Sequence, residues 1–546
     1  MHPFKALLSL TPLVSGALSA AVTRSSSSCH DLWEKAPSLL PDLEVYYAGD
    51  YPAGTNFSDP VYQSVAYPDA VPDLPAFCRF GAWIHTSNHT KAQFEVWLPK
   101  PSEWSGRFLM VGNGGDAGGV NFPDMGVPLS KYHMAVASTD TGHWGVSGNG
   151  TFAAGDPESQ IDFGYRAVHL TTVYSKKVIE AYYGKKQDKA YWLGCSSGGK
   201  QGLKEVQLYP DEYDGVIAGA AAQYWSRLLG QIYHLNVYVN GNNTEGYLTR
   251  ADYNTIHAQV LAQCDELDNV KDNVLTDPTA CIPDLKPLSC DLPNANSTSC
   301  LTDAKIATMQ KIWANWAFTN GSLIYPGQAV GSEGLSAFSV TGSPYQLSPD
   351  YYSYSVQNNT DTTKPFEVAD EEVFKDLVTE AIQINPGGIN AVDPNIGNFL
   401  KRGKLITYHG YSDTIIPSHS SILYRNEVQK ALGWKNLDDS YRLFMVPGMG
   451  HCRTGPGAWA FGEAQQRPAV LAGQGQSSQF DAEHDALLAI IEWVEKGIAP
   501  KHIVSTKWTN DNMTQGVSFT RKLCPYPQQG TYIAGDVDSA DSFECR

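Results

Sequence analysis

The chain has 546 residues, of which 42% are hydrophobic, and its formal net charge at pH 7 is −18. Because phosphate backbones are bound by clustered basic side chains, this acidic composition argues against a nucleic-acid partner. The length exceeds the roughly 100–200 residues usual for one domain, so we expect a main domain with a sizeable insertion.

Residues 1–20 have the pattern of a secretory signal peptide. Lys5 precedes a short apolar stretch, and small residues around Ala20 suit cleavage. A buried N-terminal helix is the alternative, and Pro12 and Gly16 disfavour it. This stretch is too short to cross a bilayer, and no later stretch is apolar enough. The sequence therefore predicts a secreted protein without a membrane partner.

The ten cysteines of a secreted chain are expected to form disulfides, although spacing alone cannot give their pairing. Glycosylation is expected as well, because the chain carries Asn-x-Ser/Thr sequons. They begin at Asn56, Asn88, Asn149, Asn242, Asn296, Asn320, Asn358 and Asn512.

Two strands are expected early in the chain. Apolar residues alternate over 94–98, and 107–111 is a more buried run that ends in the Gly-rich segment 112–115. A third strand, 134–138, leads towards His143, which is a possible catalytic base but is better explained as a structural residue.

A helix with an apolar stripe is expected over 162–183, stopped by Gly184. It leads into the apolar run 190–194 and the pentapeptide Gly194-Cys195-Ser196-Ser197-Gly198. A strand, a sharp turn and a helix at such a pentapeptide expose the central serine above a sheet, and the helix aims its free N–H groups at the same place. Ser196 is therefore a candidate nucleophile.

The next buried strand is expected over 213–220, and alternation of strands and helices predicts a mostly parallel sheet covered on both faces. The alternation then stops from about 228 to 399, and it resumes at 404. We interpret residues 228–399 as a lid domain inserted between two parts of a catalytic domain, 21–227 and 400–546.

Inside the lid, Asp265, Asp268 and Asp272 are crowded into a short loop. Their mutual repulsion would be relieved by a hard cation with oxygen ligands. The loop is not an EF-hand, because it lacks the glycine at its sixth position and the terminal glutamate. A solvated acidic turn is the alternative.

Two later strands supply partners for Ser196. The run 405–408 leads to Asp413, and 441–446 leads through a Gly-rich turn to His451. The chain order Ser, Asp, His is that of α/β-hydrolases, whose acid and histidine lie on loops at the carboxyl ends of later strands. An amphipathic helix over 482–497 should pack on the sheet.

Cys195 precedes Ser196, and Cys452 follows His451. A disulfide between these cysteines would bring their Cα atoms within roughly 4.4–6.8 Å and so hold the serine and the histidine in one site. The alternative is that Cys195 is a small core residue and Cys452 pairs elsewhere.

From about Cys29 onward the sequence resembles the fungal tannase and feruloyl esterase family of serine hydrolases. The motifs that carry the resemblance are Gly194-Cys195-Ser196-Ser197-Gly198-Gly199, His409-Gly410-Tyr411-Ser412-Asp413, Pro447-Gly448-Met449-Gly450-His451-Cys452 and the aspartate-rich lid loop.

The resemblance implies an α/β-hydrolase fold with a large lid and a Ser196, Asp413 and His451 triad. The expected oxyanion donors are the backbone N–H groups of Ser197 and of the 112–115 segment, where we assign Gly114, although Gly115 is an alternative and a plain turn another. The resemblance also supports the disulfides Cys29–Cys78, Cys195–Cys452, Cys264–Cys281, Cys290–Cys300 and Cys524–Cys545.

A structural calcium site in the lid is implied by the same resemblance. Its ligands would be the side chains of Asp265, Asp268 and Asp272 and the backbone carbonyls of Val270 and Val274. No organic cofactor is expected.

The resemblance predicts a carboxylic ester hydrolase that acts on phenolic esters, free or linked to polysaccharide. We favour a feruloyl esterase over a tannase, because several fungal tannases look to be cut into two chains within the lid, and this lid has no Lys-Arg pair. A catalytically silent binding protein and a peptidase are the other possibilities. The acyl group and the oligomeric state do not follow from the sequence.

Overall fold

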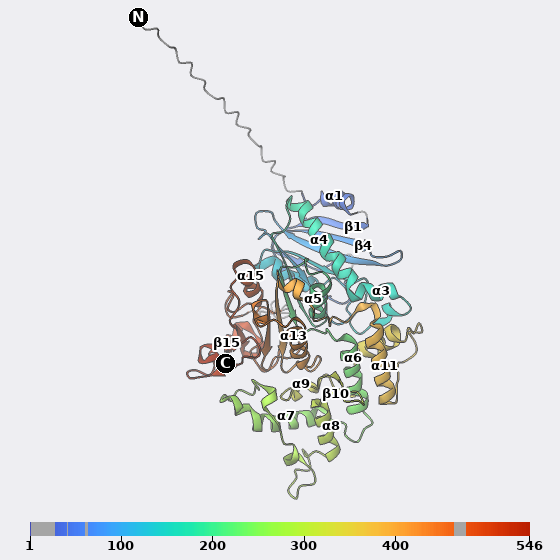
Figure 1. Cartoon of the computed structure of the whole chain (residues 1–546), viewed down its shortest axis with the longest axis vertical. Coiled ribbons are helices and arrows are strands. Elements are labelled where there is room, and N and C mark those ends of the chain that lie inside the picture. Colours follow the sequence, from blue (N-terminus) through green and yellow to red (C-terminus); the bar gives the residue numbers. More distant parts are fainter. Residues whose placement is uncertain (2–27, 41, 60–63, 464–476) are drawn as a thin grey trace.

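The computed structural model describes residues 1, 28–40, 42–59, 64–463 and 477–546. The expected signal peptide lies outside these residues, apart from Met1. Figure 1 shows a twisted sheet with helices on its faces and an inserted helical region at the end of the molecule opposite β1 and β4.

Within the described residues, nine strands form the main sheet in the order β1-β4-β5-β7-β6-β8-β9-β12-β13. The strands β1, β4 and β5 pair antiparallel with their neighbours, and all pairs from β7 to β13 are parallel. The strand bounds are Leu43–Tyr51 (β1), Phe77–His85 (β4), Lys91–Pro99 (β5), Arg107–Val111 (β6), Ala135–Thr139 (β7), Lys189–Cys195 (β8), Gly215–Gly219 (β9), Lys404–Gly410 (β12) and Tyr441–Val446 (β13).

The parallel strands are almost entirely buried, which is why they appear in the sequence as continuous apolar runs. The apolar core on one face includes residues of α4 (Ala167–Tyr183), α5 (Ser197–Leu208) and α13 (His419–Leu432). The core on the other face includes α2 (Phe122–Lys131) and α15 (Ala486–Lys496). The predicted mostly parallel sheet with two covered faces is confirmed.

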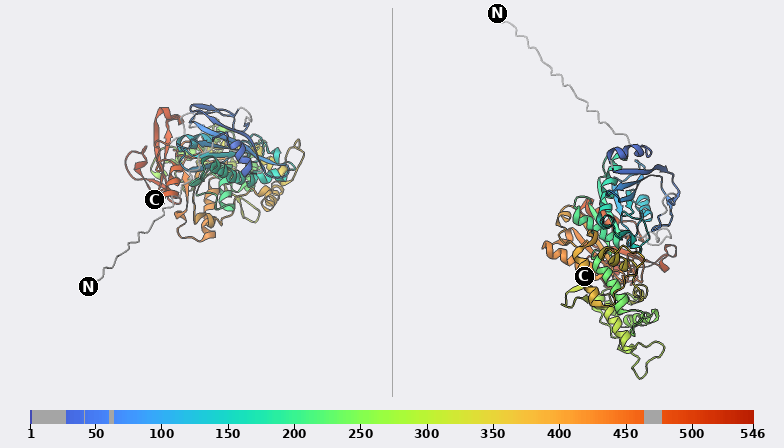
Figure 2. Two further views of the ribbon diagram at one scale, coloured as in Figure 1. Left: turned by 90° about the horizontal axis from the view of Figure 1, so that it is seen from above. Right: turned by 90° about the vertical axis from the view of Figure 1, so that its right-hand side faces the viewer.

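Between β9 and β12 the chain adds no strand to the main sheet. It forms α6 (Trp225–Tyr233), α7 (Arg250–Cys264), α8 (Asp303–Trp313), α9 (Glu333–Ser336), α10 (Leu347–Asp350), α11 (Glu371–Ile384), α12 (Gly397–Leu400) and a small hairpin of β10 (Trp316–Ala317) and β11 (Leu323–Tyr325). The right-hand view of Figure 2 agrees with Figure 1 that this region projects from the body. The exact domain boundaries stay a prediction.

A separate apolar cluster holds the projecting part of the lid together. It contains Tyr253, Ile256 and Val260 from α7 and Met309 and Ile312 from α8. By contrast, α6, α10 and α11 pack into the core that covers the main sheet. The lid is therefore anchored at its base and has a core of its own at its tip.

The C-terminal region contains two hairpins that the sequence analysis did not identify. One pairs β14 (Ile503–Trp508) with β15 (Val517–Leu523), and the other pairs β16 (Gly530–Tyr532) with β17 (Phe543–Cys545). All five expected disulfides are present, so the predicted pairing is confirmed.

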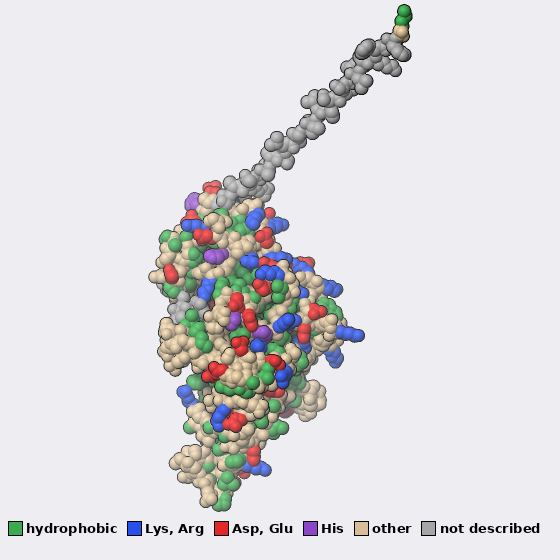
Figure 3. All heavy atoms as spheres, turned by 90° about the vertical axis from the view of Figure 1, so that its left-hand side faces the viewer, with side chains coloured by type: hydrophobic (Ala, Val, Ile, Leu, Met, Phe, Trp, Pro, Cys, Tyr) green, Lys and Arg blue, Asp and Glu red, His purple; other side chains and the backbone are tan. Residues whose placement is uncertain are grey.

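No helix in the described ranges has the length and apolar character that a membrane crossing requires. On the face drawn in Figure 3, acidic side chains are interspersed with basic ones rather than gathered in one patch.

Candidate active site

Ser196 lies in the sharp turn between β8 and α5. Its backbone has φ 63° and ψ −123°, in a region that residues other than glycine rarely occupy. The Ser196 N–H donates to the carbonyl of Gly219, so the turn is tied to the neighbouring strand. The turn also needs glycine nearby, because a Cβ at Gly194 would lie 2.5 Å from the carbonyl oxygen of Gly198.

The structure brings Ser196, His451 and Asp413 together. The Ser196 Oγ lies 2.9 Å from Nε2 of His451. The other ring nitrogen of His451, Nδ1, lies 2.7 Å from Oδ2 of Asp413. These distances are those of a nucleophile bonded to a base and of a base bonded to an orienting acid.

Asp413 is completely buried and accepts hydrogen bonds at both carboxylate oxygens. Backbone N–H groups of Ile415 and Ile416 donate to Oδ1, each at 2.9 Å. His409 lies 3.1 Å from Oδ2 through its Nε2, beside the contact from His451. Burial alone would raise the pKa of Asp413, but the charge of His451 and the bonds from His409 and His451 outweigh burial and hold this pKa well below its usual range.

Cys195 and Cys452 are bonded, with their Cα atoms 6.0 Å apart. Ser196 and His451 are the chain neighbours of these two cysteines, so the bond joins the sharp turn after β8 to the loop that follows β13. Because the bonded residues are 257 positions apart in sequence, it links two distant parts of the chain directly behind the site.

The segment 112–115 lies next to the start of α5. The N–H of Asn113 donates to Oε1 of Gln201 at 3.0 Å, and the N–H of Gly114 donates to the hydroxyl of Tyr67 at 2.8 Å. The N–H of Ser197 belongs to the first turn of α5, where helical N–H groups have no partner within the helix. Sequence reasoning missed Tyr67, because nothing in its local pattern indicates that it reaches this loop.

A cavity of about 500 Å³ opens onto Ser196 and His451. This volume lies within the roughly 300–1,000 Å³ typical of small-molecule sites. Most of its wall comes from α6, the lid segment 338–347 and the loop that follows Asp413. Trp225, Leu228, Leu229, Ile232 and Leu235 give the wall its apolar character.

Gln231 is a polar exception in this wall. The side chain is 1% exposed, and its Oε1 is buried without a hydrogen-bond partner. An unpaired buried amide oxygen is unfavourable unless a ligand supplies a donor.

His143, the other histidine considered above, is buried against Phe152, and its Nε2 lies 2.8 Å from the carbonyl of Asp116 rather than against Ser196.

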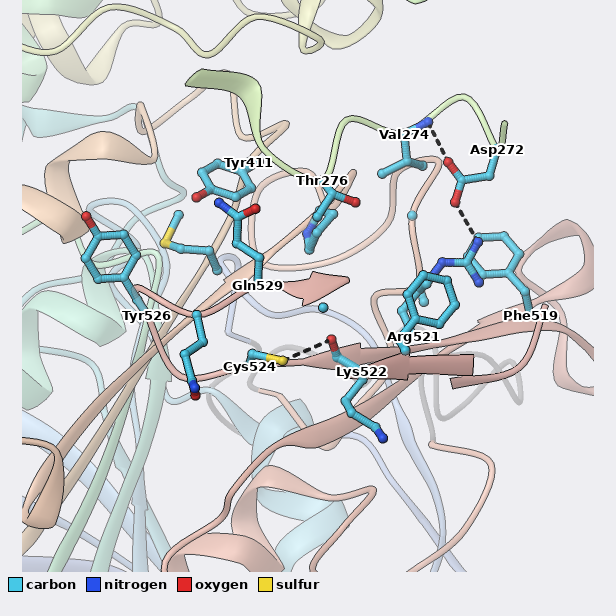
Figure 4. A pocket seen from close by; sticks show the side chains of 17 residues that line it. Asp272, Val274, Thr276, Tyr411, Phe519, Arg521, Lys522, Cys524, Tyr526 and Gln529 are labelled. Atoms are coloured by element: carbon cyan, nitrogen blue, oxygen red, sulfur yellow. Dashed lines mark hydrogen bonds and ion pairs between the residues drawn. The ribbon is translucent and has the colours of Figure 1, made fainter. Parts of the chain in front are cut away.

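The acidic lid loop lies between α7 and the C-terminal hairpin. Figure 4 shows the Asp272 carboxylate between the N–H of Val274 and the guanidinium of Arg521. Asp268 accepts from the N–H of Val270 at 3.0 Å and from the hydroxyl of Thr276. Arg521 thus neutralises part of the negative charge of the loop.

Asp265 is bonded by backbone N–H groups of the loop, including that of Asn273, but not at both of its oxygens. One of its carboxylate oxygens is buried without a hydrogen-bond partner. Burial, followed by the nearby Asp272 charge, raises the pKa of Asp265, and burial raises that of Asp268. These oxygen donors suit a hard cation chemically. Nevertheless, the described residues contain no group of three or more His, Cys, Asp or Glu side chains placed to hold a metal ion.

Comparisons with known proteins agree on one group of relatives. A family model described as "Tannase and feruloyl esterase" matches residues 78–546. The chain is 34% identical to the probable feruloyl esterase B-2 of Aspergillus fumigatus over 548 residues, which cover 98% of this chain and 99% of that protein.

Solved structures give the same picture. The crystal structure of feruloyl esterase B from Aspergillus oryzae superposes with a TM-score of 0.85 at 31% identity, covering 95% of this chain and 99% of that one. The tannin acyl hydrolase from Aspergillus niger superposes with a TM-score of 0.73 at 23% identity, covering 96% of each chain, and so shares the fold.

Proposed function

Because the chain belongs to the tannase and feruloyl esterase family, whose members are carboxylic ester hydrolases, we propose that it hydrolyses esters of hydroxycinnamic acids. The observation that carries the proposal is the contact chain from Ser196 through His451 to Asp413 at the mouth of a largely apolar cavity. Its substrates are feruloyl, p-coumaroyl or caffeoyl esters of simple alcohols or of plant cell-wall sugars.

The reaction follows from the geometry of the three residues. Ser196 Oγ attacks the ester carbonyl while Nε2 of His451, 2.9 Å away, takes the hydroxyl proton. His451 then returns this proton to the leaving alcohol, which leaves the acyl group on Ser196. Asp413 holds Nδ1 of His451 and stabilises the imidazolium that forms. A water activated by His451 releases the acid and restores Ser196.

Negative charge develops on the carbonyl oxygen during both steps. The N–H of Ser197, at the positive end of α5, is the first donor to this oxygen. The second comes from the 112–115 segment. If Gly114 is this donor, its N–H must first break its hydrogen bond to the Tyr67 hydroxyl. Gly115 is the alternative, and both glycines line the cavity.

The cavity favours an aromatic acyl group with a phenolic hydroxyl. Its apolar wall suits the ring and the propenoyl chain, and the unpaired Oε1 of Gln231 could accept the phenolic O–H. A galloyl group also carries phenolic hydroxyls, so tannase activity is the second candidate. The likeness to the tannin acyl hydrolase supports the shared fold rather than this activity.

We also propose that the protein is secreted and glycosylated. The five disulfides suit an oxidising compartment, and sequons such as that at Asn320 are exposed. A calcium ion in the acidic lid loop is proposed on the donor chemistry of Asp265 and Asp268. Its role would be structural, since the triad residues lie in other elements.

The test compares hydrolysis of methyl ferulate, methyl caffeate and methyl gallate by the purified protein. We expect the two hydroxycinnamates to be cleaved faster than the gallate. Ser196→Ala should lose at least about a thousandfold in kcat and all labelling by a fluorophosphonate probe. Faster cleavage of the gallate would favour tannase activity, and full activity of Ser196→Ala would overturn the proposal.

A further inference from the structure

A second histidine touches the acid of the triad. His409, at the end of β12, is completely buried and lies 3.1 Å from Oδ2 of Asp413 through its Nε2. This oxygen is the one that also faces Nδ1 of His451, at 2.7 Å. Two imidazoles therefore converge on a single carboxylate oxygen.

The neighbours of His409 determine which of its nitrogens carries a hydrogen. Nε2 faces only acceptors, the Asp413 carboxylate and the carbonyl of Ile416 at 2.9 Å, so it must be protonated. Nδ1 lies 2.7 Å from the hydroxyl of Ser421 on α13, which can donate to it. A neutral ring that donates from Nε2 satisfies every one of these contacts.

We propose that His409 is a positioning residue for the triad: it holds Oδ2 of Asp413 at the place from which this oxygen orients His451. The inference rests on the proposed function of Ser196, His451 and Asp413. His409 touches no reacting atom, so it acts through Asp413 alone. Ser421 supports it from behind by fixing the tautomer of the ring.

Physical reasoning gives two consequences. First, without the His409 bond the carboxylate can turn about its Oδ1 contacts with Ile415 and Ile416, and a displacement of about 1 Å in a catalytic group can cost about a hundredfold in rate. Second, while Oδ2 keeps its bond to His451, the loss of the competing His409 donor makes it a stronger acceptor for His451. The imidazolium would then be more stable, so the acidic limb of the kcat/KM profile should move to higher pH.

A matched pair of variants at one position tests the proposal. In His409→Gln the side-chain amide reaches about where Nε2 lies and can still donate to Asp413. In His409→Asn the amide ends near the position of Nδ1 and cannot. We expect His409→Asn to lose about 10- to 100-fold in kcat on methyl ferulate with little change in KM. His409→Gln should stay within a few-fold of the parent.

The pH profile separates positioning from a purely structural role. The acidic limb should shift upward in His409→Asn and stay in place in His409→Gln. His419, at the start of α13, is a further titratable group near His409; burial lowers the pKa of His419, and the charge of Asp277 opposes this shift. His419→Gln therefore serves to show that the limb belongs to His451.

A matched control removes a similar contact elsewhere. His257 in α7 lies 2.9 Å from the buried carboxylate of Glu333 in the lid, so His257→Asn shows what losing an imidazole–carboxylate pair costs in stability alone. Circular dichroism and thermal unfolding identify folded variants. Should His409→Asn not fold, Ser421→Ala, which removes only the tautomer-fixing hydroxyl, takes its place and should lower kcat several-fold.

The proposal would be overturned if the folded His409→Asn and His409→Gln variants had the same kcat and the same acidic limb. If Ser421→Ala has to replace His409→Asn, a parental kcat in Ser421→Ala would overturn it. Failure of the underlying function has a different signature. In that case Ser196→Ala would keep its activity and the parent would not react with the fluorophosphonate, whatever happens at position 409.

Discussion

At the scale of single residues, the site is fixed by backbone groups as much as by side chains. The Ser196 N–H is tied to Gly219, and Oδ1 of Asp413 is held by the N–H groups of Ile415 and Ile416. The two residues therefore keep their geometry without substrate. His451, with its side chain 19% exposed, and Ser196 both line the cavity, whereas Asp413 is buried behind them.

A buried carboxyl outside the site contributes to the pH dependence of stability. Asp485 is buried at the start of α15, where it caps the N–H of Leu488 and accepts from the Tyr132 hydroxyl. Burial raises the pKa of Asp485 from 3.8 to about 6. Because its pKa is higher in the folded state, its favourable contribution is full below pH 4 and is lost as the pH rises through 6.

The corresponding prediction is that Asp485→Asn stabilises the protein at pH 8 relative to pH 4. The free energy of unfolding of the variant minus that of the parent should rise by up to about 3 kcal/mol from pH 4 to pH 8. Thermal unfolding at both pH values measures it, with Asp376→Asn, at an exposed position of α11, as the control. A constant difference across this range would contradict the assignment.

At the scale of elements, β8 and β13 each end in a loop that carries one half of the proton-transfer pair. The sheet places their carboxyl ends at the same edge, but β9 and β12 lie between them. The Cys195–Cys452 bond spans this separation and draws the two loops together. The parallel sheet gives the approximate position, and the disulfide gives the close approach.

We therefore predict that replacing both Cys195 and Cys452 by alanine lowers turnover even where the protein still folds. A displacement of about 1 Å between Ser196 and His451 can cost about a hundredfold in rate. Circular dichroism, turnover of methyl ferulate and fluorophosphonate labelling should be compared for variant and parent. The Cys290–Cys300 pair in the lid, replaced in the same way, is the matched control. Parental turnover in a natively folded variant would show that the bond is not needed for catalysis.

At the scale of the whole molecule, the lid and the C-terminal hairpin meet at the acidic loop. Arg521 on β15 pairs with Asp272 of the lid at 2.5 Å, and both side chains are largely buried. Other links join the lid to the catalytic part, including the bond from the Tyr345 hydroxyl to Ser147 at the cavity wall. The position of the lid thus depends on contacts with residues that are distant from it in sequence, such as Arg521 and Ser147.

If the acidic loop binds calcium, chelation by EDTA or Asp268→Ala should lower the thermal unfolding temperature far more than turnover at moderate temperature. Arg521→Met removes the competing positive charge, and so it should make the unfolding temperature more dependent on added calcium. Arg546→Met, at an exposed pair with Glu544, is the control. If neither EDTA nor calcium changed the unfolding temperature of any variant, this would count against the site.

Much of the fold was predictable because it is encoded locally. The buried strands β6 and β8 appear as apolar runs, and α4 ends where Gly184 takes a left-handed conformation. The positions of Cys195 and Cys452 beside Ser196 and His451 predicted the disulfide that the structure contains. The hairpins β14–β15 and β16–β17 were missed. β15 is partly exposed, and β16 and β17 have three residues each, so these strands lack a strong apolar period; β14 is buried, but its second half is the polar run Ser505-Thr506-Lys507.

The sequence by itself determined the candidate triad, because Ser196, Asp413 and His451 each lie in a motif whose residue types and order are typical of that chemistry. Only the tertiary structure decided what surrounds them. The hydroxyl of Tyr67 on Gly114, the contact of His409 with Asp413 and the unpaired Gln231 in the cavity wall are all long-range contacts. Such contacts depend on how strands and lid pack in three dimensions, and no local pattern of residues records that packing.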